Sequence, residues 1–291
     1  MPEAPTVWSG ESGAIKSGAT VYAAIRDWKA SGKADNQAVI DSGTSGGTTR
    51  LGGNLDWSGS WSADGYPTVK PGDAVVFTGS IDNVEGLTGP IIVESVRVNY
   101  DIAGGKPITH DVTFSGNGAW TLGAATAADA AVAAPVSSVG VVVQLAAPAA
   151  LPTWVNLEQV ETITLEFKRS ALAYVDSTSA GWNKRKRGPF DATIAIKVHP
   201  DATATDVAYG LQGLPSPRVV KMIKITDAQT TPGVYALNWM MFSDISDVDV
   251  NRETQAIVSC TLNAALCATT SIATVMTLGT VTGPNAQTLW P

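Results

Sequence analysis

The chain has 291 residues, of which 44% are hydrophobic and only 15% are charged, and its formal net charge is −7. Most of this charge lies in residues 1–145, which carry 8 basic and 14 acidic side chains. An acidic first half argues against a general nucleic-acid-binding protein, because such a protein needs a basic face that releases counterions. The low charge is typical of a protein that covers much of its surface with copies of itself, and a secreted β protein is the alternative.

The first residues and the cysteines further limit the class of protein to which the chain can belong. The opening MPEAPTVWSGESG has neither the basic nor the apolar region of a signal peptide, and no uninterrupted apolar stretch could span a membrane. We therefore expect a soluble, intracellular product. Cys260 and Cys267 are too few for a disulfide framework or a four-ligand zinc site. We expect free, buried thiols, with a disulfide between them as the alternative.

Alternating apolar and polar residues predict strands through the first half of the chain. These strands are Leu55–Trp61, Ala74–Ser80, Ile91–Asp101 and Ile108–Ser115. The segments around them are predicted to be irregular: an arm at 1–18, a long loop at 33–53, a Pro-Gly turn at Tyr66–Asp73, a surface loop at Ile81–Pro90 and a glycine hairpin at Ile102–Pro107. Val21–Lys29 fits either a strand or a short helix.

The second half is predicted to continue in the same way after an Ala- and Val-rich segment, Ala119–Pro152. This segment predicts a short helix near Ala124–Ala134 and a strand at Val139–Leu145. The following strands are Gln159–Phe167, Phe190–Val198, Arg218–Ile225, Val234–Phe242 and Ala256–Leu262. Ser170–Val175 either continues a strand or forms a short helix. The tail, Ala264–Pro291, has no charged residue, so it must be covered by its own domain or by a neighbour.

The second half repeats the first in degenerate form. The runs Gly53-Asn54-Leu55-Asp56 and Gly188-Pro189-Phe190-Asp191 both read Gly-x-apolar-Asp, and each lies between an Arg-bearing loop and an alternating strand. Ile91–Phe114 can likewise be laid on Tyr235–Ser259. The repeat predicts a mainly β protein with an N-terminal arm at 1–18, one β domain at 19–150 and a second at 151–291.

The sequence holds no motif of a catalytic or metal site. His110 and His199 stand near strand ends without aligning in the repeat, and no nucleophile elbow, zinc-protease motif or phosphate loop occurs. Asp244, Asp247 and Asp249 resemble a calcium-binding cluster but lack the glycine and terminal glutamate of a standard loop, so a solvated hairpin tip is the better interpretation. We therefore predict no enzymatic activity, no metal and no cofactor.

The sharpest charge feature is the basic run Lys184-Arg185-Lys186-Arg187, within the predicted loop 176–189. It fits a solvated loop, or a contact with nucleic acid or with an acidic face of another subunit. The acidic first half favours the subunit contact over nucleic acid. The equivalent first-half loop keeps Arg50 alone. The candidate inter-subunit contact residues are therefore Arg50, Lys184, Arg185, Lys186 and Arg187.

Tryptophan is frequent, with nine residues in the chain. Trp57 and Trp61 lie on the apolar face of a predicted strand, so we expect them in the core. Exposed tryptophans would instead offer stacking platforms. That possibility defines a second interpretation, a two-domain carbohydrate-binding or adhesion module.

One stretch of the first half has a distinctive pattern over Tyr66–Asn117. A Pro-Gly-Asp turn feeds a strand, and a long strand then pairs back across a hairpin that ends in a Phe-Ser-x-Asn-Gly-like run. The residues that carry this pattern are Pro71-Gly72-Asp73, Val75-Val76-Phe77, Val93–Tyr100 and Val112–Gly118. In this pattern the chain resembles the major tail tube proteins of long-tailed bacteriophages.

The resemblance implies two tandem β-sandwich or half-barrel domains, each with a short helix, and rings that stack into a virion tail tube. Members of the family carry one such domain and form hexameric rings, so a chain with two is expected to close a trimeric ring with pseudo-sixfold symmetry. The tube would be assembled in the host cytoplasm with other tail proteins. Its acidic lumen would let DNA pass without specific binding. The loops 33–53 and 176–189 are candidates for contacts between stacked rings.

Overall fold

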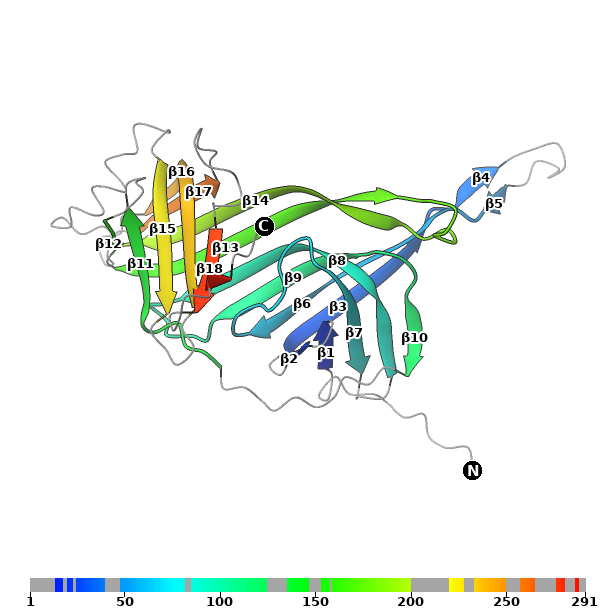
Figure 1. Cartoon of the computed structure of the whole chain (residues 1–291), viewed down its shortest axis with the longest axis horizontal. Coiled ribbons are helices and arrows are strands. Elements are labelled where there is room, and N and C mark those ends of the chain that lie inside the picture. Colours follow the sequence, from blue (N-terminus) through cyan, green and yellow to red (C-terminus); the bar gives the residue numbers. More distant parts are fainter. Residues whose placement is uncertain are drawn as a thin grey trace, which may run out of the picture. The chain divides into compact units, whose positions relative to one another are not determined.

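The structure is a computed structural model that describes residues 14–17, 20–22, 25–39, 48–81, 85–124, 135–146, 153–157, 159–199, 220–227, 233–249, 257–264, 276–280 and 286–287. These residues form strands and no helix, and the ladders with a described register are antiparallel (Figure 1). The prediction of a mainly β protein is confirmed.

The strands fall into two series along the chain. The first series is β1 (Ala14–Ser17), β2 (Thr20–Tyr22), β3 (Ile25–Ala34), β4 (Gln37–Val39), β5 (Thr49–Leu51), β6 (Leu55–Asp64), β7 (Ala74–Ile81), β8 (Glu85–Asp101), β9 (Thr109–Gly116) and β10 (Thr121–Ala124). The second is β11 (Val141–Ala146), β12 (Val155–Leu157), β13 (Val160–Tyr174), β14 (Lys184–Val198), β15 (Val220–Asp227), β16 (Gly233–Asp249), β17 (Ile257–Ala264), β18 (Met276–Thr280) and β19 (Ala286–Gln287).

Each predicted strand is present, and the differences concern the segments between them. The segment 33–53 is not wholly a loop, because β3 runs to Ala34 and β4 pairs with β5. Most of the predicted surface loop Ile81–Pro90 is strand, since β8 begins at Glu85. Val21–Lys29 and Ser170–Val175 lie largely in strands. The predicted helix near Ala124–Ala134 lies outside the described residues except for Ala124, the last residue of β10.

The glycines of β8 explain why the sequence of its first part predicts a loop. A Cβ on Gly89 would meet the ring of Trp57 and the Cα and Cβ of Trp120, and a Cβ on Gly86 would meet the backbone of Gly79. These glycines allow close approach of neighbouring strands and rings inside a sheet, which is a second reason for glycine in a strand besides a turn.

The strand pairings of the second series repeat those of the first. In the first series, β1 pairs with β2 and β7, β8 pairs with β7, β10 and β9, and β6 pairs with β9 and β3. In the second, β11 pairs with β12 and β15, β16 pairs with β15, β18 and β17, and β14 pairs with β17 and β13. Three consecutive strands have 8, 17 and 8 residues in both series.

The chain divides into two compact units, each made of three segments. Unit 1 contains Met1–Val96, Asp111–Ala134 and Lys168–Phe190, and unit 2 contains Arg97–His110, Pro135–Phe167 and Asp191–Pro291. The tip of the β8–β9 hairpin therefore belongs to unit 2, and the tip of the β13–β14 hairpin belongs to unit 1. The expected division into 1–18, 19–150 and 151–291 followed the sequence repeat alone, and it remains a prediction.

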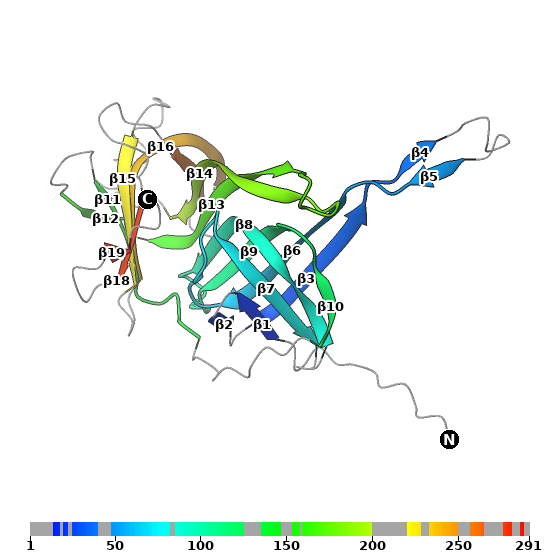
Figure 2. The same ribbon diagram turned by 45° about the vertical axis from the view of Figure 1, so that its right-hand side comes forward.

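The core of unit 1 is aromatic. The ring of Phe77 on β7 packs against Trp61 on β6 and Phe114 on β9, with centroids 5.8 and 4.7 Å apart. Trp57 on β6 contacts Phe114 and Trp120. Because β7 pairs with β1 and β8 and not with β6 or β9, these contacts require the strands of this unit to curve, and Figure 2 shows their curved course. The prediction that Trp57 and Trp61 are core residues is confirmed, since both are buried.

The core of unit 2 is mainly aliphatic and uses the equivalent positions. Each buried aromatic residue of unit 1 has a buried counterpart on the corresponding strand of unit 2. The counterparts of Trp57, Trp61, Phe77 and Phe114 are Ala192, Ile196, Ile223 and Leu262. The inward-facing positions are thus shared, while the side chains that fill them differ in volume.

Candidate functional site

The basic run lies on a strand and not in a loop. Lys184–Arg187 are the first four residues of β14, directly after the turn that follows β13. The predicted loop 176–189 is therefore shorter than expected. Lys184 and Arg185 are half-buried, whereas Lys186 and Arg187 are exposed. All four belong to unit 1.

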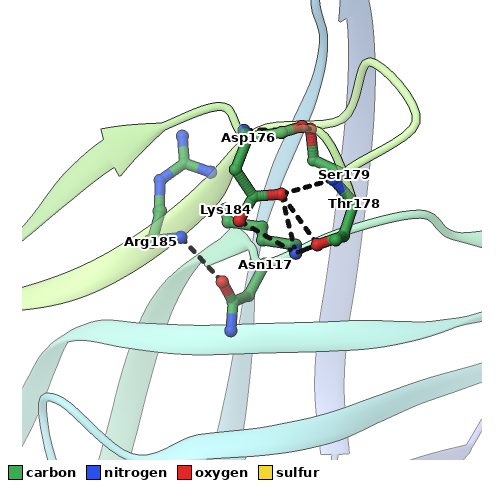
Figure 3. A network of polar contacts seen from close by, with 6 residues as sticks. All are labelled: Asn117, Asp176, Thr178, Ser179, Lys184 and Arg185. Atoms are coloured by element: carbon green, nitrogen blue, oxygen red, sulfur yellow. Dashed lines mark hydrogen bonds and ion pairs between the residues drawn. The ribbon is translucent and has the colours of Figure 1, made fainter.

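Lys184 closes the turn that precedes it (Figure 3). Its Nζ donates to Asp176 Oδ1 at 3.1 Å and to Thr178 Oγ1 at 2.6 Å. Asp176 Oδ1 also accepts the backbone N–H of Thr178 at 2.9 Å. The hydrogen bond from the Thr178 hydroxyl and that from Lys184 lower the pKa of Asp176. The role of Lys184 here is local, because it fixes the connection between β13 and β14.

Arg185 makes the most extensive contact of the run. Its Nη1 and Nη2 donate to the two carboxylate oxygens of Asp56, at 2.9 and 2.8 Å, and Nη1 also donates to the carbonyl of Gly116. The backbone N–H of Arg185 donates to Asn117 Oδ1 at 2.7 Å (Figure 3). Such a forked geometry is specific to arginine and to a carboxylate. It ties the start of β14 to β6 and to the end of β9.

The ion pair between Arg185 and Asp56 is largely buried, with side-chain exposures of 9% and 15%. Burial raises the pKa of Asp56, but the hydrogen bonds and charge of Arg185, together with hydrogen bonds from Asn183 and the Trp57 N–H, lower it by more, so the net shift is downward. Asp56 Oδ1 also accepts the N–H of Trp57 at 2.9 Å. This carboxylate is therefore held in its charged form at the rim of the aromatic core.

The last two residues of the run are also engaged within unit 1. Lys186 Nζ lies 5.1 Å from the centroid of the Tyr174 ring. Arg187 Nε donates to the carbonyl of Gly72, a residue whose positive φ of 92° the Pro-Gly turn requires. The whole run thus packs on the chain that carries it.

Arg50 has a different position. It lies on β5, paired with Ala38, and its side chain is exposed. Among the residues that the structure describes, no acidic partner of Arg50 is found. The structure therefore brings the four residues of the run into contact with unit 1 and leaves Arg50 apart from them.

The remaining polar residues of interest lie on strands where they are described. His110 is buried within β9, and Cys260 is a buried free thiol on β17 whose pKa burial raises to about 11. Cys267 lies outside the described residues. Asp244 and Asp247 lie within β16 and not at a hairpin tip as expected, and Asp249 is the last residue of this strand. Groups of three or more metal-ligating side chains are absent from the part of the chain that the structure describes.

Comparison with known proteins adds no relative. No family model matches the chain, and no curated protein matches it. Within the described residues there is also no helix of the length and hydropathy that crossing a membrane requires.

Sequence reasoning missed the partner of the basic run. Asp56 and Asn117 were not singled out, although Asp56 belongs to the repeated Gly-x-apolar-Asp motif. The available signal was that the repeat places an arginine six residues before each of the two aspartates, at Arg50 and at Arg185.

Proposed function

We propose that this chain is a structural virion protein whose copies form rings that stack into a bacteriophage tail tube. The proposal follows the resemblance over Tyr66–Asn117 and is supported by the observed β architecture. In that stretch, the Pro-Gly turn, β7, β8 and β9 follow one another as the resemblance requires.

The observation that carries the proposal is the exchange of hairpins between the two halves of the sequence. Residues 97–110 come from the first strand series but belong to unit 2, and 168–190 come from the second series but belong to unit 1. Each half thus completes the unit built mainly by the other. Two linked copies of one subunit would interact in this way inside a larger assembly, and a pair of independent binding modules has no need to do so.

The stoichiometry follows from the duplication. If one chain takes the place of two subunits, three chains close a ring with pseudo-sixfold symmetry. The low content of charged residues, 15%, suits a protein with large self-contacts. The acidic balance of residues 1–145 suits a lumen through which DNA passes without binding, because like charges repel. Assembly would take place in the host cytoplasm, with other tail proteins as partners.

The alternative, a carbohydrate-binding or adhesion module, needs tryptophans on an exposed face. Four of the nine tryptophans, Trp28, Trp57, Trp61 and Trp120, instead pack against one another or against phenylalanines within unit 1. These four rings cannot also serve as platforms, so the described residues do not favour this function.

The test is the mass and shape of the purified protein. Light scattering after size-exclusion chromatography is expected to give a mass of three chains, and negative-stain images are expected to show rings and stacked tubes. A chain that stays monomeric at high concentration, or rings of six chains, would contradict the proposal.

A further inference from the structure

The two strand series place Asp56 and Asp191 in equivalent positions. Each aspartate ends a Gly-x-apolar-Asp motif and precedes a buried residue, Trp57 or Ala192. Their local geometry is the same as well. Trp57 donates its backbone N–H to Asp56 Oδ1 at 2.9 Å, and Ala192 donates to Asp191 Oδ1 at 2.9 Å. The separation of Asp56 from Asp191 equals that of Arg50 from Arg185.

The equivalent charges have different surroundings in a single chain. Asp56 is covered by the forked contact of Arg185, whereas Asp191 is exposed. Arg50, the counterpart of Arg185, is exposed too. In the described part of the chain, neither Asp191 nor Arg50 takes part in an ion pair. One contact of the repeat is thus made inside the chain, and its counterpart is left open.

We propose that Arg50 of one copy binds Asp191 of the next copy, in the way that Arg185 binds Asp56 within unit 1. The partner is a second copy of this chain, because the repeat supplies both halves of the contact and the described residues do not close it within one chain. The inference rests on self-association as in the proposed function and goes further by assigning the contact surfaces.

A second open contact points to the same partner. Within unit 2, the end of β8 pairs with the start of β13. Ile102 donates its N–H to the carbonyl of Glu161 at 2.9 Å, and Arg97 Nη2 lies 3.0 Å from Glu166 Oε1. In the repeat, β16 corresponds to β8 and β3 corresponds to β13. The equivalent pairing would therefore join the end of β16 to β3. In the described residues, the pairing of β3 runs along β6.

The charges of these two strands are complementary between copies. The end of β16 contains Asp244, Asp247 and Asp249, and β3 exposes three basic side chains and one acidic side chain, Arg26, Lys29, Lys33 and Asp27. The signs of the charges are exchanged relative to the contact inside the chain. There, β8 supplies the cation Arg97 and β13 supplies the anion Glu166. Opposite charges directly across a strand pair stabilise it, and like charges destabilise it.

Both open contacts join the same pair of surfaces. Arg50 and β3 belong to the first strand series, and Asp191 and β16 belong to the second. The first series of one copy therefore contacts the second series of the next. Such a head-to-tail contact is heterologous, so it generates a ring or an open chain of copies and not a twofold dimer.

Charge exchange at Arg50 and Asp191 tests the proposal. Arg50→Glu and Asp191→Arg are each expected to weaken self-association at least about thirtyfold, because each places like charges at the contact. The double variant R50E/D191R restores opposite charges and should associate within about tenfold of the wild type. Lys197→Glu, an exposed charge reversal on the same strand as Asp191, is the matched control and should associate like the wild type. The readout is sedimentation velocity, with thermal melting to show that all variants fold.

Mixing the two single variants sharpens the test. Each R50E copy can bind a D191R copy through both of its surfaces, so the mixture should associate while each variant alone does not. Strict alternation cannot close a ring of three, so the mixture should form open chains or even-numbered rings. Single variants that associate like the wild type, or a double variant that stays dissociated, would overturn the proposed contact.

The same experiment separates this contact from the tail-tube function. Wild-type tubes that R50E leaves intact would overturn the contact and leave the function standing. Wild-type protein that forms only open chains sensitive to R50E would support the contact and contradict the ring.

Discussion

Replacing Arg185 with alanine tests how far the basic run stabilises the chain that carries it. The substitution removes both hydrogen bonds to Asp56 and the one to the Gly116 carbonyl. Breaking a buried ion pair costs about 3–5 kcal/mol, because one charge remains buried without its partner. Asp56 keeps the N–H of Trp57 and its side chain is 15% exposed, so part of that cost is recovered by water. We expect the substitution to lower the free energy of unfolding of unit 1 by about 2–4 kcal/mol.

The assay is urea unfolding followed by tryptophan fluorescence, because Trp57 directly follows Asp56 and lies in the core of unit 1. The two units need not unfold together, so the midpoint of the fluorescence transition is the quantity to compare. Lys186→Ala, which removes an exposed charge and its contact with the Tyr174 ring, should cost less than about 1 kcal/mol. The double variant D56A/R185A should be less destabilised than the sum of the single variants, since the pair interacts directly.

The pH dependence of this loss gives an independent check. The folded-state pKa of Asp56 lies below its ordinary value, so the pair stabilises the fold above the unfolded pKa of about 3.9. That stabilisation is lost as the pH falls through the folded pKa. The difference between wild type and R185A should therefore be largest near neutral pH and shrink below about pH 4. A difference equal to that of K186A, or one that does not change with pH, would refute the reasoning.

Three further predictions concern the cores and the basic run. Trp61→Ala should destabilise unit 1 by about 3–5 kcal/mol in the same urea assay, whereas the exposed Leu172→Ala should cost less than about 0.5 kcal/mol; equal effects would contradict the aromatic core. Cys260 should resist a thiol reagent at pH 8 in the folded protein and react after unfolding, because it is buried and its pKa is raised to about 11; in a Cys267→Ser background, rapid reaction of the native protein would contradict this. Arg187→Ala should lower the stability of unit 1 by about 1 kcal/mol, since it frees the Gly72 carbonyl, and an unchanged urea midpoint would show that this hydrogen bond contributes nothing.

Much of the local structure was predictable because strands leave a period of two in the sequence. The alternation of Leu55, Trp57 and Trp61 located β6, and the Gly104-Gly105 pair located the hairpin after β8. The prediction was wrong where a glycine fits two structures, a turn or a strand position that allows close approach of a neighbour. The glycine-rich start of β8 looked like a loop, but Gly89 gives room to the ring of Trp57 and Gly86 to the backbone of Gly79. Which structure applies depends on residues from other strands, so local sequence cannot decide it.

The candidate site was predictable in its residues but not in its contacts. The sequence alone identified the basic run and the solitary Arg50, because charge is rare in this chain. It could not show that Arg185 is tied to Asp56, a residue 129 positions away. The run was therefore expected to face another subunit, and the structure places it against its own unit.

The sequence by itself determined the period of the strands, the positions of the glycine turns and the existence of a repeat, because these depend on near neighbours or on comparison of the chain with itself. Only the tertiary structure decided which segments complete each compact unit. Residues 97–110 and 168–190 are joined to the units by pairing and burial between strands that are distant in sequence. The same long-range contacts decided which of two equivalent arginines is covered, and they left Arg50 and Asp191 as the exposed pair.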